Sequence, residues 1–135
     1  MYPLIGKKVF IDYDHSKYNV TFLDATVMKI DGSFGEIPAR GVVEYKAVLV
    51  DKNIYMVFWF EEFSKMLVTQ VQNLNTLKVY TNIVNVATSE FYHLRGKMTI
   101  MKNNNEKNNE PQASPAPAPA KITPALTDPL QKVQP

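Results

Sequence analysis

The chain has 135 residues, enough for one domain, and 45% of them are hydrophobic, so it can bury a core. The formal net charge of +2 gives no field strong enough to indicate a nucleic acid or a membrane surface as partner. The absence of cysteine excludes disulfides, thiol catalysis and cysteine-type zinc sites. No basic segment followed by an apolar one opens the chain, and no run approaches about 20 apolar residues, so we expect a soluble cytoplasmic protein.

The first half of the chain predicts strands joined by short turns. Residues 7–13 and 18–23 alternate in polarity and flank a turn at 14–17, which favours a hairpin. A third strand is expected over 25–30. Residues 31–41 hold three of the five glycines and a proline, so they predict a long loop of the kind that often serves as a functional lid.

The second half predicts five more strands, over 42–50, 54–62, 66–72, 77–86 and 91–101. Both faces of 54–61 are apolar over most of their length, which is typical of a strand that is covered on both sides or forms the wall of a closed barrel. Gly96 lies in the middle of the last strand, where a bulge or a bend is expected.

About eight evenly spaced strands without a convincing helix indicate an all-β protein, either a sandwich or an antiparallel up-and-down barrel. We predict a barrel of about eight strands over residues 1–102, whose interior is filled by side chains or holds one small ligand. Residues 103–135 are rich first in asparagine and then in proline and alanine, so we predict a disordered tail.

Few residues suggest chemistry. The common phosphate-binding and hydrolase motifs are absent, and two histidines cannot by themselves make a good metal site, so we predict no cofactor and no metal. The aromatic residues are not interleaved with a basic patch, which disfavours nucleic-acid binding. A barrel could, however, gather a polar set in its interior: Tyr13, Tyr18, Tyr45, Trp59, Glu61, Thr69 and Arg40.

Glu61 shares a predicted strand face with Trp59, which supports two interpretations. In a cavity, the carboxyl would have its charged form disfavoured unless a donor such as Arg40 compensated, and it would be a candidate acid or base. Alternatively, Glu61 lies beside Glu62 at the end of the strand, in water. The sequence leaves both interpretations open.

Several segments together resemble the MoaF-like family, named for molybdenum cofactor biosynthesis protein F, over roughly residues 6–101. The resemblance implies a lipocalin-like (calycin) barrel and does not define a biochemical role. The segments that carry it are Gly6-Lys-Lys-Val-Phe-Ile-Asp-Tyr-Asp14, Tyr18-Asn-Val-Thr-Phe22, Tyr55-Met-Val-Phe-Trp-Phe-Glu61, Val68-Thr-Gln-Val71, Val79-Tyr-Thr-Asn-Ile83 and Phe91-Tyr-His-Leu-Arg-Gly96.

A second resemblance is to the bacterial phenolic acid decarboxylases, which are also small lipocalin-like barrels. Leu4-Ile-Gly6 and Trp59-Phe-Glu61 match that pattern, and Arg40 falls near the position of a loop arginine. The family's tyrosine pair, which holds the substrate carboxylate, reads Ile11-Asp12-Tyr13 here, so its first tyrosine is missing.

The function predicted first is binding of one small, partly aromatic or apolar molecule inside the barrel, through Tyr13, Arg40, Tyr45, Trp59 and Glu61. The first alternative is a cofactor-free lyase of the phenolic acid decarboxylase type, with Glu61 as acid or base. The second is a non-catalytic interaction module with a filled interior, in which the tail makes the contact. A homodimer and a protein partner for the proline-rich tail stay open.

Overall fold

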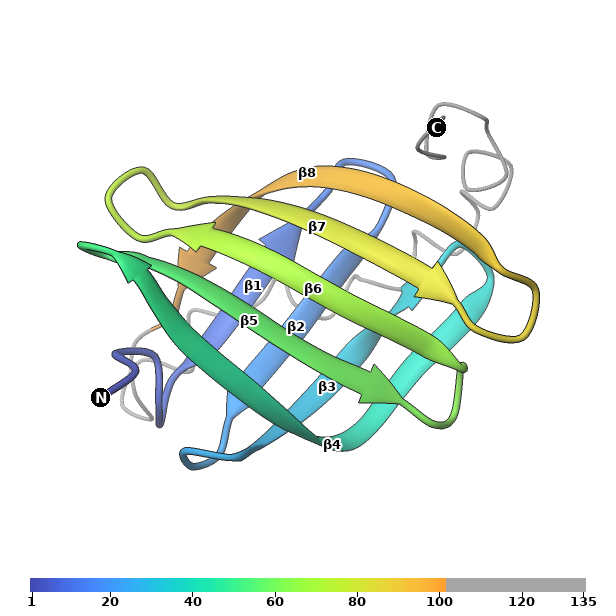
Figure 1. The fold of residues 1–135 in the computed structure, drawn as a ribbon, viewed down its shortest axis with the longest axis horizontal. Helices are drawn as coiled ribbons and strands as arrows, with labels where there is room; N and C mark the ends of the chain where they lie inside the picture. Colours follow the sequence, from blue (N-terminus) through green and yellow to red (C-terminus); the bar gives the residue numbers. More distant parts are fainter. Residues whose placement is uncertain (102–135) are drawn as a thin grey trace.

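The structure is a computed structural model that describes residues 1–101, and within them eight strands form a closed antiparallel barrel in chain order (Figure 1). This confirms the predicted all-β class and up-and-down barrel. The described residues contain no helix long and apolar enough to cross a membrane. The predicted disordered tail lies outside the described residues. The strands are β1 (Lys8–Asp12), β2 (Lys17–Phe22), β3 (Val27–Phe34), β4 (Ile37–Asp51), β5 (Ile54–Glu61), β6 (Met66–Asn73), β7 (Lys78–Asn85) and β8 (Glu90–Ile100).

The predicted lid at residues 31–41 is wrong, because these residues form the end of β3, a tight turn and the start of β4. Gly35 takes the turn with a positive φ of 69°. Gly32 lies within β3, where an added Cβ would come 2.6 Å from the Lys17 carbonyl oxygen. Gly41 lies within β4 against the Phe63 ring, 2.6 Å from such a Cβ. Gly32 and Gly41 therefore allow close packing of neighbouring groups. The sequence pattern alone could not distinguish glycines needed for close packing from glycines that make a loop flexible.

Of the bulge or bend expected at Gly96, the bulge is absent. The pairing of β7 with β8 continues through Val79 and Gly96 without a shift in register. A Cβ on Gly96 would lie 2.7 Å from the Tyr13 ring and 2.8 Å from the Asp12 carbonyl oxygen. The missing side chain thus leaves room for Tyr13 inside the barrel, and a register shift occurs instead in β4, between Leu49 and Asp51.

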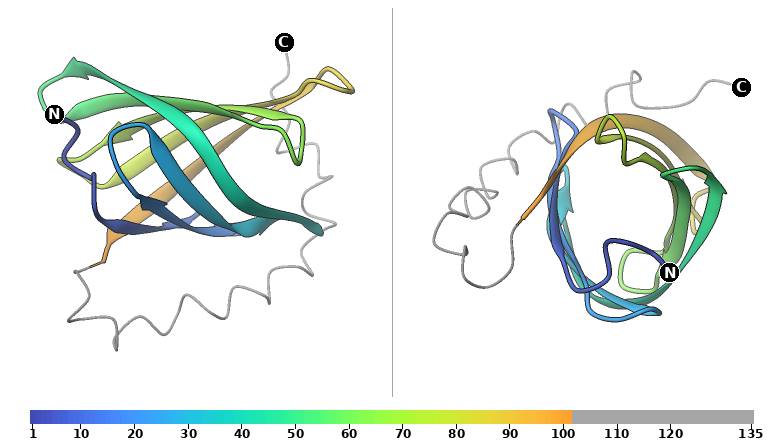
Figure 2. Two further views of the ribbon diagram at one scale, coloured as in Figure 1. Left: turned by 90° about the horizontal axis from the view of Figure 1, so that it is seen from below. Right: turned by 90° about the vertical axis from the view of Figure 1, so that its left-hand side faces the viewer.

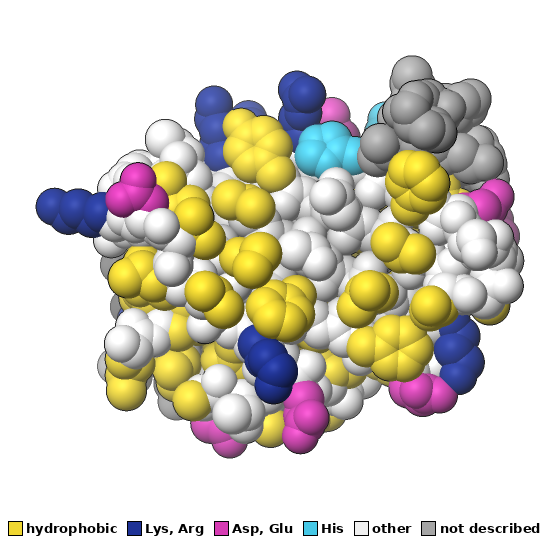
Figure 3. Space-filling view, viewed as in Figure 1, with side chains coloured by type: hydrophobic (Ala, Val, Ile, Leu, Met, Phe, Trp, Pro, Cys, Tyr) yellow, Lys and Arg dark blue, Asp and Glu magenta, His cyan; other side chains and the backbone are white. Residues whose placement is uncertain are grey.

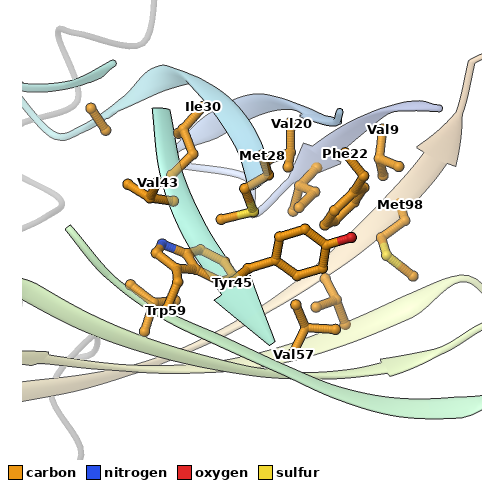
Figure 4. Close-up of a cluster of buried hydrophobic side chains, with 14 of the residues drawn as sticks. Val9, Val20, Phe22, Met28, Ile30, Val43, Tyr45, Val57, Trp59 and Met98 are labelled. Carbon is orange, nitrogen blue, oxygen red and sulfur yellow. The ribbon is translucent and has the colours of Figure 1, made fainter. Parts of the chain in front are cut away.

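The core consists of the inward side chains of all eight strands. Figure 4 shows Tyr45 and Trp59 pointing from β4 and β5 into a cluster with Phe22 and Met28. Trp59 is only 7% exposed, which confirms that it is buried inside the barrel. The outward side chains of β5 are also apolar, so this strand has two apolar faces and only one of them is covered by the barrel.

One end of the barrel is closed by the segment that precedes β1. Tyr2 and Leu4 are buried there, and the Tyr2 ring packs edge-on against Phe22 and Tyr55 at centroid distances of 5.1 and 5.2 Å. Figure 2 shows the N-terminal segment at this opening. The opposite end, where the β1–β2, β3–β4, β5–β6 and β7–β8 turns gather, has no such cover among residues 1–101 and remains the accessible end.

Candidate functional site

A hollow enters the barrel at the accessible end. Its cavity volume is about 30 Å³, and the empty space that includes open solvent at the mouth is about 520 Å³. The wall is mostly apolar, with residues from β1 through β7. Because a cavity of roughly 10–15 Å³ already holds one water molecule, this cavity has room for only a few water-sized groups. Most of a larger ligand would have to lie nearer the mouth.

Glu61 is the charged residue of this wall and is 6% exposed. It ends β5, and the Lys65 amide donates to the Glu61 carbonyl at 2.7 Å, which closes the turn into β6. That turn places Ser64 over the carboxyl group. The Trp59 indole Nε1 donates to Glu61 Oε2 and the Ser64 hydroxyl donates to Oε1, each at 2.8 Å. The structure therefore places Glu61 in the cavity, and the interpretation of a strand-end residue in water is wrong.

The electrostatic setting of Glu61 differs from the expected one in one respect. Burial raises the pKa of Glu61, and the hydrogen bonds from Trp59 and Ser64 oppose that rise. Arg40 was expected to oppose it as well. Arg40 instead points outward from β4, with 74% of its side chain exposed, and its Nε pairs with Asp31 Oδ1 at 2.9 Å. No lysine, arginine or histidine is present among the described residues of the cavity wall.

A row of hydrogen-bonded polar side chains runs inward from the cavity. The Tyr13 hydroxyl lies 2.6 Å from the Thr81 hydroxyl oxygen and accepts a hydrogen bond from Gln70 Nε2 at 3.1 Å. Gln72 Nε2 donates to Gln70 Oε1 at 2.8 Å, and the Tyr2 hydroxyl donates to Gln72 Oε1. Burial raises the pKa of Tyr13 to about 12, so its hydroxyl stays protonated and can donate. The row connects the accessible end to the closed one.

The structure brings only some of the predicted site residues together. Tyr13, Tyr18, Trp59 and Glu61 all line the cavity. Tyr45 is buried, but it packs at the closed end, where its hydroxyl donates to the Asp24 carbonyl oxygen at 2.6 Å. It therefore supports the closed end and does not line the cavity.

Sequence reasoning also missed three polar cavity residues and chose the wrong face of β6. The residues missed are Ser64, Gln70 and Thr81. In β6, Gln70 faces inward and Thr69 lies on the opposite face. The alternation in β6 gave the right period, but both faces carry apolar residues, so the pattern did not indicate which face is inside. Thr81 was detectable, because it lies between Val79 and Ile83 on the apolar face of β7.

No metal site is evident in the described part of the chain. Residues 1–101 contain no group of three histidine, aspartate or glutamate side chains close enough to hold an ion. His93 lies on the outer surface, where its Nδ1 is 2.9 Å from Asn82 Oδ1 and its ring stacks on Tyr80. The polar groups of the cavity suit an organic ligand, which they could bind by hydrogen bonds.

The comparisons with known proteins agree with this architecture. No curated protein gave a significant match. A crystal structure from Burkholderia vietnamiensis, described provisionally as a beta-lactamase, superposes with a TM-score of 0.67 and 22% identity over 74% of this chain and 97% of that one. At that identity the likeness concerns the fold alone. A family model described as MoaF-like matches residues 5–99, nearly the whole barrel. The chain therefore belongs to the MoaF-like family.

Proposed function

We propose that the barrel binds one small, partly aromatic or apolar molecule at its accessible end. The ligand places a small polar head next to Glu61. Its apolar body lies against Trp59, Tyr18 and Phe34, which all line the hollow. A largely apolar recess with a few converging polar groups is the usual form of a small-molecule site.

The observation that supports this proposal best is the burial of the Glu61 carboxyl group. A buried ionisable group destabilises the fold unless it is fully hydrogen-bonded or paired. Glu61 has two donors and no cation on the described wall, so the fold alone gives little reason for a carboxyl group at this position. A ligand that hydrogen-bonds to it would supply that reason.

Native mass spectrometry of the protein purified from its source tests the proposal, because a bound molecule adds a discrete mass. The same molecule should bind Glu61→Gln about 10- to 100-fold more weakly, equivalent to about 1–3 kcal/mol for a lost buried hydrogen bond. Glu62→Gln is the matched control, since Glu62 is 76% exposed and pairs with Lys65 on the surface. Equal affinity of wild type and Glu61→Gln would remove Glu61 from the site.

The lyase alternative receives no support from the geometry. It needs Arg40 beside Glu61 at the reacting end, and Arg40 lies on the outer surface, paired with Asp31. It also needs a second tyrosine at position 11, where the chain has a buried isoleucine. Release of carbon dioxide from hydroxycinnamate by wild type, lost in Glu61→Gln, would restore this alternative.

The interaction-module alternative has one specific observation in its favour. The outer face of β5, β6, β7 and β8 presents apolar side chains in a cross-strand row, in which Phe60 pairs with Leu67, Leu67 with Val84 and Val84 with Phe91. Phe60, Leu67 and Phe91 are 40%, 42% and 39% exposed. Figure 3 shows hydrophobic side chains gathered over this face, with most charged ones toward its edge. Exposed apolar patches of this kind mark interaction surfaces.

The partner that we favour for this face is a second copy of the chain. A net charge of +2 leaves little repulsion between copies, and a two-fold dimer would pair the row with itself. Sedimentation equilibrium should then find a dimer that Leu67→Glu converts to a monomer. Leu23→Glu is the control, because Leu23 is also exposed, at 49% against 42% for Leu67, but lies in the β2–β3 turn. A wild-type protein that is monomeric at every concentration would refute this second function.

A further inference from the structure

We propose that the head of the ligand is a positively charged hydrogen-bond donor, such as a primary amine, and that the site rejects carboxylates. This inference rests on the proposed function of the hollow and specifies the chemistry of its ligand. Three independent features of the hollow lead to it.

The first feature is the unused hydrogen-bonding capacity of Glu61. An ionised carboxylate is an acceptor only, with about four lone-pair positions on its two oxygens. Within residues 1–101, Trp59 Nε1 occupies one position on Oε2 and the Ser64 hydroxyl occupies one on Oε1. About two positions therefore remain for a ligand, and only a ligand that donates hydrogen bonds can fill them.

The second feature is the sign of the charge. Glu61 is the charged side chain among the described residues that line the hollow, and no cation there balances it. A ligand carboxylate would bring a second negative charge next to the first in a largely dehydrated site, where like charges repel strongly. An ammonium group would instead supply the missing opposite charge and form charge-assisted hydrogen bonds with the carboxylate.

The third feature is the lining of the recess. Trp59, Tyr13 and Tyr18 contribute aromatic rings to the same wall, and the Tyr13 and Tyr18 rings lie edge-to-face at 5.8 Å. Aromatic rings attract cations through their electron-rich faces. Lining and charge thus favour the same class of head group.

Three compounds with one aromatic ring and different heads test the inference on the full-length protein. Benzylamine carries a cationic donor, benzyl alcohol a neutral donor and benzoate an anion. Because Trp59 is the only tryptophan and its Nε1 bonds to Glu61, the indole N–H signal in a ¹H–¹⁵N spectrum reports binding beside the carboxylate. We expect benzylamine to bind at least tenfold more tightly than benzyl alcohol, and benzoate to cause no shift.

Glu61→Gln should reduce the preference for benzylamine over benzyl alcohol to less than threefold, while benzyl alcohol still binds. Glu62→Gln, which removes an exposed charge one residue away, should leave the preference unchanged. Benzoate binding as tightly as benzylamine, or a preference that survives Glu61→Gln, would overturn the inference and leave the proposed site intact. Failure of all three compounds to shift the indole signal of wild type would overturn both the site and its ligand class.

Discussion

Tyr13→Phe tests whether the buried polar row holds the barrel interior together. The substitution removes one hydroxyl group and keeps the ring that fills the space left by Gly96. Two partners are affected, since the Thr81 hydroxyl lies 2.6 Å and Gln70 Nε2 lies 3.1 Å from the lost oxygen. Each lost hydrogen bond costs about 0.5–1.5 kcal/mol, and an unpaired buried donor costs about 1–3 kcal/mol. We therefore expect a loss of about 2–4 kcal/mol in the free energy of unfolding.

Urea denaturation followed by Trp59 fluorescence measures this loss, provided that the slope m is unchanged. Tyr92→Phe is the control, because the Tyr92 hydroxyl donates to Glu90 at the surface and its removal should cost less than about 0.5 kcal/mol. Thr81→Val completes a double-mutant cycle. The double variant should lose about 1–2 kcal/mol less than the sum of the single variants, because they share one hydrogen bond.

A loss below about 0.5 kcal/mol in Tyr13→Phe would refute the reasoning, because it would mean that water or rearranged side chains satisfy Gln70 and Thr81 at no cost. Full additivity in the cycle would show that the contact between the Tyr13 and Thr81 hydroxyls contributes nothing to stability, even if each single variant is destabilised.

Three further predictions concern Glu61, Gly96 and Trp59. Burial raises the pKa of Glu61 above 4.5, so the stability that this group contributes is present below that pH and is lost as the pH rises through the folded pKa. As the pH is raised from 4 to 8, the free energy of unfolding of Glu61→Gln should therefore increase relative to that of wild type in urea titrations. A difference between the two proteins that does not change with pH would contradict this. Gly96→Ala should lose about 1–3 kcal/mol, because its Cβ would lie 2.8 Å from backbone that cannot move easily; an unchanged thermal midpoint would argue otherwise. Trp59→Ala should cost roughly 3–5 kcal/mol, and free iodide quenching of native Trp59 fluorescence would speak against its burial.

The sequence by itself determined the fold class. Alternating polarity and hairpin-length turns define eight antiparallel strands because the strand period of two and the local turn chemistry are properties of neighbouring residues. Trp59 and Glu61 were also identified from the sequence, since both lie on one face of a strand whose length and ends are clear from its flanking turns. The family resemblance followed from the same local segments and was confirmed by the match over residues 5–99.

Only the tertiary structure decided which face of a strand turns inward and at which end of the barrel a residue lies. Arg40 and Thr69 lie in strands whose side chains alternate between the two faces, but both face outward, whereas Gln70 faces inward. Tyr45 faces inward but lies at the closed end, with its hydroxyl on Asp24. When both faces of a strand are apolar, local periodicity cannot distinguish them. Which face turns inward depends on how all eight strands close into the barrel. Which end is closed depends on Tyr2, which fills one end and lies far in sequence from the site residues.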